Sequence, residues 1–392
     1  MKELNKLKNR ISTFAVFRDL LRDPVITALY EYLRNPAISL YAEFVSRLYT
    51  ANGGNISEYI KELCENSENV YVKAVASGKE IPKEMFDAVL EELNVLQAVA
   101  DLTPEMLSAA IQYEGWLPKF TNAELDLTSH YMHRAEHIGK YGYGIYAKNR
   151  MFYIDGADAI VPVHNADTIR FSDLADYERE RKRILDNTNA LLLGKPAANI
   201  LLTGDAGTGK SSTVKAVVNE IWRSGLRMIE VRKDQLRAIP KILNELSQNP
   251  LKFILFVDDL SFLKDDDNFH ALKAVLEGSV TVKSRNVVIY ATSNRRHIIK
   301  ETFSDREGDD VHRNDTLQEL LSLSERFGIH ITFSKPNKET YLKIIHHVAE
   351  ENGIVTDEAL DLLAERFALE RGGRSARLAR QFIDGLLSKQ GD

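Results

Sequence analysis

The chain has 392 residues, 44% of them hydrophobic and 28% charged, and carries a formal net charge of −6 at pH 7. That length suits about two or three domains, and the composition is ordinary for a globular protein. No apolar run approaches the roughly 18–20 residues of a membrane span, and the negative charge disfavours a sequence-independent nucleic-acid binder.

The amino terminus and the cysteine content indicate the compartment. Cys64 is the only cysteine, so intramolecular disulfides and thiolate zinc sites are excluded. The opening stretch, MKELNKLKNRISTFAVFRDLL, has basic residues but neither a clean apolar core nor a small-residue cleavage site, unlike a signal peptide. We therefore expect a cytoplasmic protein without a membrane span.

Residues 1–118 are predicted to form a helical domain. Two stretches, DPVITALYEYLRNPAISLYAEFVSRLYT and PKEMFDAVLEELNVLQAVADL, carry apolar residues at helical spacing. Pro36, Pro82 and Pro104 fall where helices would begin or end. No chemical motif occurs in this region, and the sequence assigns it no role.

Residues 119–171 differ in composition from the helical region before them. The stretch YGYGIYAKNRMFYIDGADAIVPVH is rich in Tyr, Ile and Val, with a predicted turn at 148–150, and indicates a small β-hairpin or short sheet that serves as a connector.

Three histidines also lie in this connector, at helical spacing. His130, His133 and His137 share one helical face, a pattern compatible with metal binding. The sequence assigns them no carboxylate or cysteine partner, which favours a simple polar face instead.

From 172 to 334, strand-like runs alternate with helical ones. The runs span residues 200–203, 227–231, 253–257, 287–291 and 330–333. This alternation predicts a three-layer αβα domain, with a parallel five-stranded sheet between helices. Residues 335–392 are helical again and are predicted to form a helical lid.

The stretch NILLTGDAGTGKSSTVKAVVNEI contains the phosphate-loop pattern G-x-x-x-x-G-K-[ST] between a strand and a helix. Lys210 is expected to contact the β- and γ-phosphates of a nucleotide, and the Ser211 hydroxyl to ligate Mg²⁺. A chance glycine-rich turn would not require the flanking strand and helix. The predicted nucleotide-binding residues are Gly204, Asp205, Ala206, Gly207, Thr208, Gly209, Lys210, Ser211 and Ser212.

The stretch FILFVDDLSF runs from five apolar residues straight into two carboxylates, Asp258 and Asp259. Such a run indicates a strand buried on both faces, and neighbouring carboxylates repel each other unless a cation offsets their charge. Downstream of a phosphate loop, Asp258 is expected to hold Mg²⁺ and Asp259 to act as the base toward the attacking water. The alternative for Asp259 is a solvated helix or loop cap.

Two further candidate catalytic residues lie beside strand-like runs, one after the fourth run and one before the fifth. Asn294, in VVIYATSNRR, is placed to position the attacking water, although an Asn after a strand is commonly a turn residue. Arg326, in LSLSERFGIHITF, precedes the fifth strand and could reach a neighbouring subunit's γ-phosphate. Its alternative is a surface ion pair with Glu325 or another nearby acid.

The lid contributes a last pair of candidates. In RGGRSARLARQFIDGLL, Ser375 is a predicted helix N-cap, and Arg374 and Arg377 lie near the start of that helix. Either arginine could contact phosphate, or both could lie on a solvated helix face.

No N-K-x-D guanine-reading motif follows the phosphate loop, which favours ATP over GTP as the nucleotide.

The ordered set GDAGTGKSS, FVDDLSF, ATSNRR, SERFGI and GGRSAR resembles the AAA+ ATPases. More narrowly, residues 173–385 resemble an uncharacterised bacterial family of predicted AAA+ ATPases, a domain of unknown function. The resemblance implies ATP and Mg²⁺ as ligands. Lys210 and Ser211 then take the Walker A roles, Asp258 and Asp259 the Walker B roles, and Asn294 that of sensor 1.

Other segments resemble those of particular AAA+ groups. SERFGI looks like the arginine-finger segment of Holliday-junction branch-migration motors, and RSAR like their sensor 2 segment, which favours Arg377 over Arg374. The resemblance implies that Arg326 acts in trans within a ring of about six subunits. The DD and TSN pairs resemble those of replicative-helicase loaders. The stretch VRKDQLRAIPKILNEL lacks an aromatic-apolar-Gly pore loop, which disfavours a protein-threading unfoldase.

Two functions remain open from the sequence. One is an ATP-hydrolysing machine that remodels or loads an unidentified protein or nucleic-acid partner. The other is a nucleotide-controlled binding switch with slow or no turnover, which stays open because Asp259 stands where many such ATPases have the longer Glu.

Overall fold

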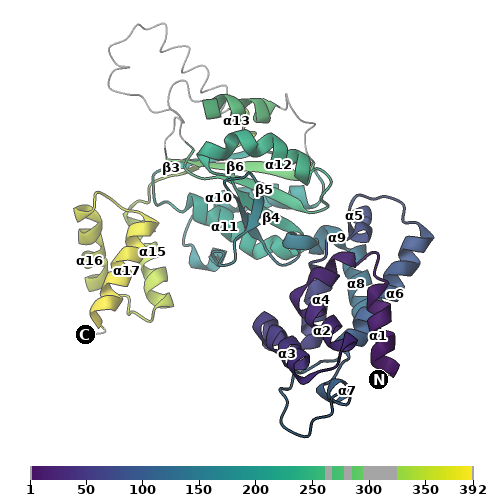
Figure 1. Ribbon diagram of the computed structural model, residues 1–392. Coiled ribbons are helices and arrows are strands. Elements are labelled where there is room, and N and C mark those ends of the chain that lie inside the picture. Colours follow the sequence, from purple (N-terminus) through teal and green to yellow (C-terminus); the bar gives the residue numbers. More distant parts are fainter. Residues whose placement is uncertain (1, 261–266, 278–284, 295–324, 391–392) are drawn as a thin grey trace. The chain divides into compact units, whose positions relative to one another are not determined.

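The computed structural model describes residues 2–260, 267–277, 285–294 and 325–390 (Figure 1). The chain divides into two compact units, which we call unit 1 (residues 1–148) and unit 2 (residues 149–392). Among the described residues, none of the helices is both long and apolar enough to span a bilayer.

Unit 1 is helical, as predicted for the amino-terminal region. Short polar side chains begin several of its helices by accepting hydrogen bonds from free backbone N–H groups: Asp23 caps α2, Asn69 caps α5 and Asp126 caps α8. Its elements are α1 (Lys2–Ser12), η1 (Arg18–Arg22), α2 (Pro24–Arg34), α3 (Ile38–Asn52), α4 (Ile56–Glu65), α5 (Val70–Ala76), α6 (Lys83–Ala100), α7 (Pro104–Ser108), α8 (Leu127–Glu136), α9 (Ile138–Tyr141) and η2 (Gly144–Tyr146).

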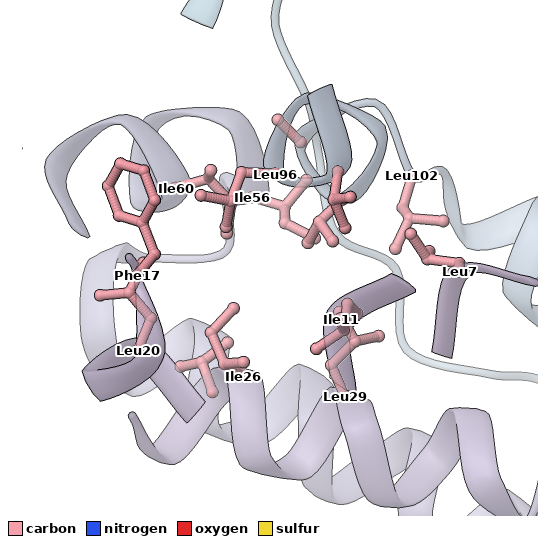
Figure 2. Packing of buried hydrophobic residues seen from close by; sticks show 14 of the residues in the cluster. Leu7, Ile11, Phe17, Leu20, Ile26, Leu29, Ile56, Ile60, Leu96 and Leu102 are labelled. Carbon is pink, nitrogen blue, oxygen red and sulfur yellow. The ribbon is translucent and has the colours of Figure 1, made fainter. Parts of the chain in front are cut away.

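The core of unit 1 joins helices that are distant in sequence. Figure 2 shows Ile11 of α1, Leu29 of α2 and Leu96 of α6 in one buried cluster. Burying one such aliphatic side chain contributes about 1.5–3 kcal/mol. Glu92 of α6 is also buried. Its carboxylate accepts hydrogen bonds from the N–H groups of residues 15, 16 and 17 at 2.7, 3.1 and 2.8 Å, which offset the cost of removing the charge from water.

Unit 2 is built on a seven-stranded sheet in the order β2-β1-β4-β5-β6-β3-β7. Neighbouring strands are parallel except for the antiparallel pair β1–β2. The strands are β1 (Met151–Ile154), β2 (Ile160–Pro162), β3 (Ile200–Gly204), β4 (Leu226–Glu230), β5 (Lys252–Val257), β6 (Val287–Ser293) and β7 (Ile329–Phe333). The predicted α/β fold with a parallel sheet is therefore confirmed.

The sheet is wider than the five predicted strands, which are β3 to β7. The hairpin expected as a connector within 119–171 forms β1 and β2, and β1 pairs with β4 at the edge of the sheet. Phe152 and Ile154 of β1 are buried while Tyr153 between them is exposed. This alternation suits a strand with one covered face. The hairpin extends the sheet because β1 pairs with β4.

Helices cover both faces of the sheet, with α10 (Glu178–Leu192) and α11 (Lys210–Ile221) on one side and α12 (Ile239–Leu246) and α13 (Asp267–Glu277) on the other (Figure 1). Apolar residues of α10 and α11 share a core with the strands. Phe253 to Val257 of β5 are fully buried, as the apolar run predicted. Three more elements complete this unit: η3 (Phe171–Asp173), η4 (Trp222–Ser224) and η5 (Lys233–Ala238).

The carboxyl-terminal residues form a three-helix lid with its own apolar core. Its helices are α15 (Lys338–Glu351), α16 (Glu358–Glu370) and α17 (Ala376–Gln390). Asn337 and Asp357 cap the first two of these helices, and Ile345, Ala364 and Ile383 bring one side chain from each helix into the core.

Candidate nucleotide site

The candidate site lies at the carboxyl edge of the sheet. Because β3, β5 and β6 are parallel, the residues that follow them meet at one edge, where open α/β sheets bind ligands. A cavity of about 630 Å³ opens there. Its lining comes from the phosphate loop, the ends of β5 and β6, the segment before α10, and the lid helices α15 and α17.

Glycines shape the loop between β3 and α11. Gly207 and Gly209 have φ of 80° and 90°, a region that favours glycine. Gly204, at φ 143°, lies so close to β7 that an added Cβ would come within 2.1 Å of the Phe333 carbonyl oxygen. The loop leads directly into the N-terminus of α11, where free N–H groups and the helix dipole favour a bound anion.

Lys210, the first residue of α11, points its ammonium into this loop. The side chain is almost fully buried, and Nζ donates to the carbonyl oxygens of Gly204 and Asp205 at 2.9 and 2.7 Å. It also donates to Asn294 Oδ1 at 3.0 Å. Burial lowers the pKa of Lys210, and the neighbouring carboxylates of Asp258, Asp205 and Asp259 oppose that shift. These acids help to keep the ammonium charged.

Asp258, just after β5, faces the first turn of α11. Its Oδ1 accepts hydrogen bonds from Ser211 Oγ at 2.6 Å and from Thr292 Oγ1 at 2.5 Å. The carboxylate and the Ser211 hydroxyl are oxygen ligands of the kind that Mg²⁺ takes beside nucleotide phosphates. The donor set therefore fits Mg²⁺. Thr292 was not among the predicted site residues, although it lies two positions before Asn294.

Asp259, the second residue after β5, has an unusual backbone conformation. Its φ of 52° is uncommon for a residue with a side chain, and its N–H donates to Thr292 Oγ1 at 2.9 Å. Its Oδ1 accepts from Asn294 Nδ2 at 2.6 Å. Asn294 thus bridges two charged groups, because its carbonyl oxygen accepts from Lys210 while its amide nitrogen donates to Asp259.

The two lid arginines have different surroundings. Arg377 lines the cavity, and its backbone N–H donates to the Gly207 carbonyl oxygen at 3.3 Å. Arg374 forms two hydrogen bonds with Glu365, at 2.8 and 2.6 Å, and is not part of the cavity lining. The choice of Arg377 stays a prediction, for a residue that does line the cavity. Arg380, one turn further along α17, also lines the cavity and was not among the predicted residues.

The segment before α10 was missed entirely. Asp176 and Tyr177 both have positive φ, 64° and 63°, and both line the cavity with Arg181. The Tyr177 hydroxyl donates to the Ser334 carbonyl oxygen at 2.5 Å. No motif marks these residues, because only the path of the chain before α10 brings them to the cavity.

Arg326 lies away from the cavity. Arg326 precedes β7, so it lies at the amino-terminal end of the parallel strands. The phosphate loop follows β3, which pairs with β7, and therefore lies at their carboxyl-terminal end. Its Nη2 lies 2.7 Å from Glu277 Oε1 at the end of α13. The intrachain partner is therefore Glu277 rather than Glu325. Residues 295–324, between Asn294 and this segment, lie outside the described part of the chain.

A family model described as "Protein of unknown function (DUF815)" matches residues 147–390. The ATPase family gene 2 protein of Schizosaccharomyces pombe is 25% identical over 223 residues, which cover 50% of this chain and 25% of that protein. The ORC1-type DNA replication protein of Methanocorpusculum labreanum is 28% identical over 234 residues, covering 51% and 54%. The match thus spans a quarter of the first relative and about half of the second.

Among solved structures, the Thermotoga maritima RuvB Holliday junction branch migration motor is 16% identical, with a TM-score of 0.38. The alignment covers 55% of this chain and 63% of that one.

Proposed function

The chain belongs to the family described as protein of unknown function (DUF815), an AAA+ ATPase-like family. We propose that it binds ATP with Mg²⁺ and hydrolyses the nucleotide to remodel or load a macromolecular partner. The observation that carries this proposal is the hydrogen bond between Ser211 and Asp258, next to the buried ammonium of Lys210 in the glycine-rich loop between β3 and α11.

The phosphate loop would bind the triphosphate. Lys210 holds its ammonium with three hydrogen bonds to protein oxygens, and phosphate oxygens would replace some of them with charge-assisted bonds. Ser211 and Asp258 would hold Mg²⁺, which neutralises developing charge on the phosphates. The lid residue Arg377 would close on the nucleotide from the other side of the cavity.

Asp259 and Asn294 would act on the attacking water. Asp259 has a carboxylate oxygen at the cavity, and Asn294 holds that oxygen at 2.6 Å. When phosphate draws the Lys210 ammonium away, the carbonyl oxygen of Asn294 is released to accept a hydrogen bond from water. The pair then orients and deprotonates one nucleophile.

Arg326 would serve a neighbouring subunit in a ring of about six. Two observations support this proposal: the residue is absent from the lining of the cavity, and it precedes β7 at the opposite edge of the sheet. An arginine supplied in trans can stabilise the charge on the transferring phosphoryl group.

The proposal is tested by nucleotide binding and turnover in matched lysine variants. Lys210→Ala should lose tight binding of ATP with Mg²⁺, because a hydrogen bond to a charged group contributes about 1.5–3 kcal/mol. The control is Lys215→Ala on the same helix, whose lysine lies 3.9 Å from Asp167 and outside the cavity lining. A folded Lys210→Ala protein with unchanged ATP affinity would refute the assignment.

A nucleotide-controlled switch is a second candidate, favoured by one observation. Asp259 has a shorter side chain than Glu, and Asn294 already occupies one of its oxygens. If Asp259 removes the proton of the attacking water only slowly, bound ATP would set the conformation of the protein without being hydrolysed at a useful rate. Steady-state ATPase assays with and without nucleic acid or cell extract separate the two candidates. Stimulated turnover supports the machine, and tight binding with negligible turnover supports the switch.

A further inference from the structure

The end of α8 gathers three metal-binding side chains far in sequence from the nucleotide site. His133, Glu136 and His137 are exposed, and their candidate ligand atoms lie within 4.8 Å of one another. We propose that these three residues form a site for a divalent transition-metal ion of the Zn²⁺ class.

The backbone of α8 prepares one imidazole for coordination. His137 Nδ1 lies 3.0 Å from the His133 carbonyl oxygen. A carbonyl oxygen can only accept a hydrogen bond, so in the neutral imidazole Nδ1 carries the proton and Nε2 keeps its lone pair. A hydrogen bond of this kind, made by the other ring nitrogen, is how metal-ligating histidines are commonly oriented.

The second imidazole is adjacent to the first. The ring centroids of His133 and His137 lie 4.4 Å apart, at an interplanar angle of 38°. The spacing i to i+4 brings the two imidazoles to one face of the helix, and a carboxylate oxygen of Glu136 lies within 4.8 Å of a ligand atom of each. Ligand atoms around tetrahedral Zn²⁺ lie about 3.3 Å apart for bonds of about 2.0 Å. Small side-chain rotations of exposed residues would close the remaining distance.

The site differs from the histidine triad that the sequence spacing suggested. His130 is engaged elsewhere, because its Nε2 lies 2.7 Å from Glu65 Oε1. The carboxylate that the sequence could not assign is Glu136. Among the described residues, none forms an ion pair or a side-chain hydrogen bond with Glu136. His133 Nε2 lies 3.4 Å from the Tyr141 hydroxyl, a long contact that coordination through Nε2 would replace.

The donor set selects the class of metal. Two imidazole nitrogens and one carboxylate suit Zn²⁺ and its neighbours in the first transition row, whereas Mg²⁺ and Ca²⁺ favour oxygen ligands. Three protein ligands leave a fourth position for water or a partner's ligand. The cations of Arg134 and Lys140, which lie over the Tyr141 ring, oppose a bound metal, and solvent screens that repulsion at an exposed site.

Titration of the full chain with Zn²⁺ alone, followed by calorimetry, tests the proposal. The variants are His133→Ala, His137→Ala and Glu136→Gln, with His130→Ala as the matched control from the same helix. We expect one Zn²⁺ per chain in the wild type and in His130→Ala, and affinity more than about tenfold weaker in each of the three ligand variants. Co²⁺ absorption provides a second readout, because tetrahedral nitrogen and oxygen ligands give visible bands.

Two results would overturn the site. One is a wild-type chain that binds no Zn²⁺ at concentrations up to about 100 µM, a weak limit for three protein ligands. The other is binding that persists unchanged in the double variant His133→Ala/His137→Ala. All three ligand residues are exposed, so circular dichroism should show an intact fold in each variant.

Discussion

Two carboxylates, one in each unit, differ in how far the surrounding protein satisfies their oxygens with hydrogen bonds. Glu92 in unit 1 is buried, and backbone N–H groups satisfy both of its oxygens. Asp258 in unit 2 is exposed at the cavity, and the hydrogen bonds that it accepts from the described residues all reach Oδ1. Among the described residues, none donates to its Oδ2. Backbone N–H groups therefore satisfy Glu92, whereas Asp258 Oδ2 is available to the Mg²⁺ ion that we propose.

The same contrast extends to the arginines of unit 2. Arg374 is committed to Glu365 by two short hydrogen bonds, while Arg377 lines the cavity. Arg326 holds an exposed pair with Glu277, and exposed pairs contribute only about 0–1 kcal/mol to stability. Such a pair is easily exchanged for a stronger anionic partner, and this is what an arginine acting in trans requires.

The largest expected effect tests whether Arg326 has a role beyond its ion pair. Arg326→Ala should bind ATP normally but hydrolyse it about 10³–10⁵-fold more slowly, as for arginine fingers in other nucleotide hydrolases. Glu277→Gln is the control, because it breaks the same pair and leaves the arginine in place. Steady-state ATPase assays measure the difference.

A mixing experiment then tests the action in trans. Arg326→Ala mixed with the separately inactive Lys210→Ala should regain some activity, because an intact phosphate loop can then meet an intact arginine across an interface. Absence of rescue in subunits that demonstrably exchange would contradict this role.

The next effect concerns Asp259. Asp259→Asn should retain ATP and lose about 10²–10⁴-fold in turnover, the usual contribution of a general base. Asp258→Asn should instead weaken the Mg²⁺ dependence of binding. Nucleotide affinity and single-turnover hydrolysis, measured with and without Mg²⁺, separate the two aspartates. Wild-type turnover in Asp259→Asn would mean that the base lies elsewhere.

The comparison of carboxylates predicts opposite effects on folding and binding. Glu92→Ala should lower the free energy of unfolding by about 3 kcal/mol, because it leaves buried N–H groups without acceptors. Asp258→Ala should change that free energy by less than about 1 kcal/mol and lose nucleotide binding with Mg²⁺. Urea unfolding of both variants is the measurement, and equal destabilisation would remove the proposed distinction.

The smallest effect is the pH dependence of the lid. The hydrogen bonds from Arg374 hold the pKa of Glu365 below its usual value of 4.5. The stabilisation is therefore complete above about pH 4.5 and is lost as pH falls through the lower pKa of the folded state. We expect at most about 1 kcal/mol, absent in Glu365→Gln. Thermal unfolding of both proteins between pH 3 and 6 measures the change.

The sequence predicted those parts of the site that depend on local pattern. The phosphate loop combines a fixed spacing with a flanking strand and helix, and each of these is encoded by residues near one another in the chain. The buried strand before Asp258 follows from five apolar residues in a row. The helical amino-terminal region and the parallel sheet follow in the same way from hydrophobic periodicity.

Tertiary structure decided what depends on residues far apart in the chain. It joined β1 to β4, brought Tyr177 and Arg181 to the cavity, and separated Arg377 from Arg374 by giving the latter Glu365 as a partner. It also linked Asn294 to both Lys210 and Asp259. Spacing along a chain specifies which side chains share a face or a loop. Which distant side chains meet is set by the packing of whole elements, because an arginine or an amide binds whichever partner that packing brings within reach.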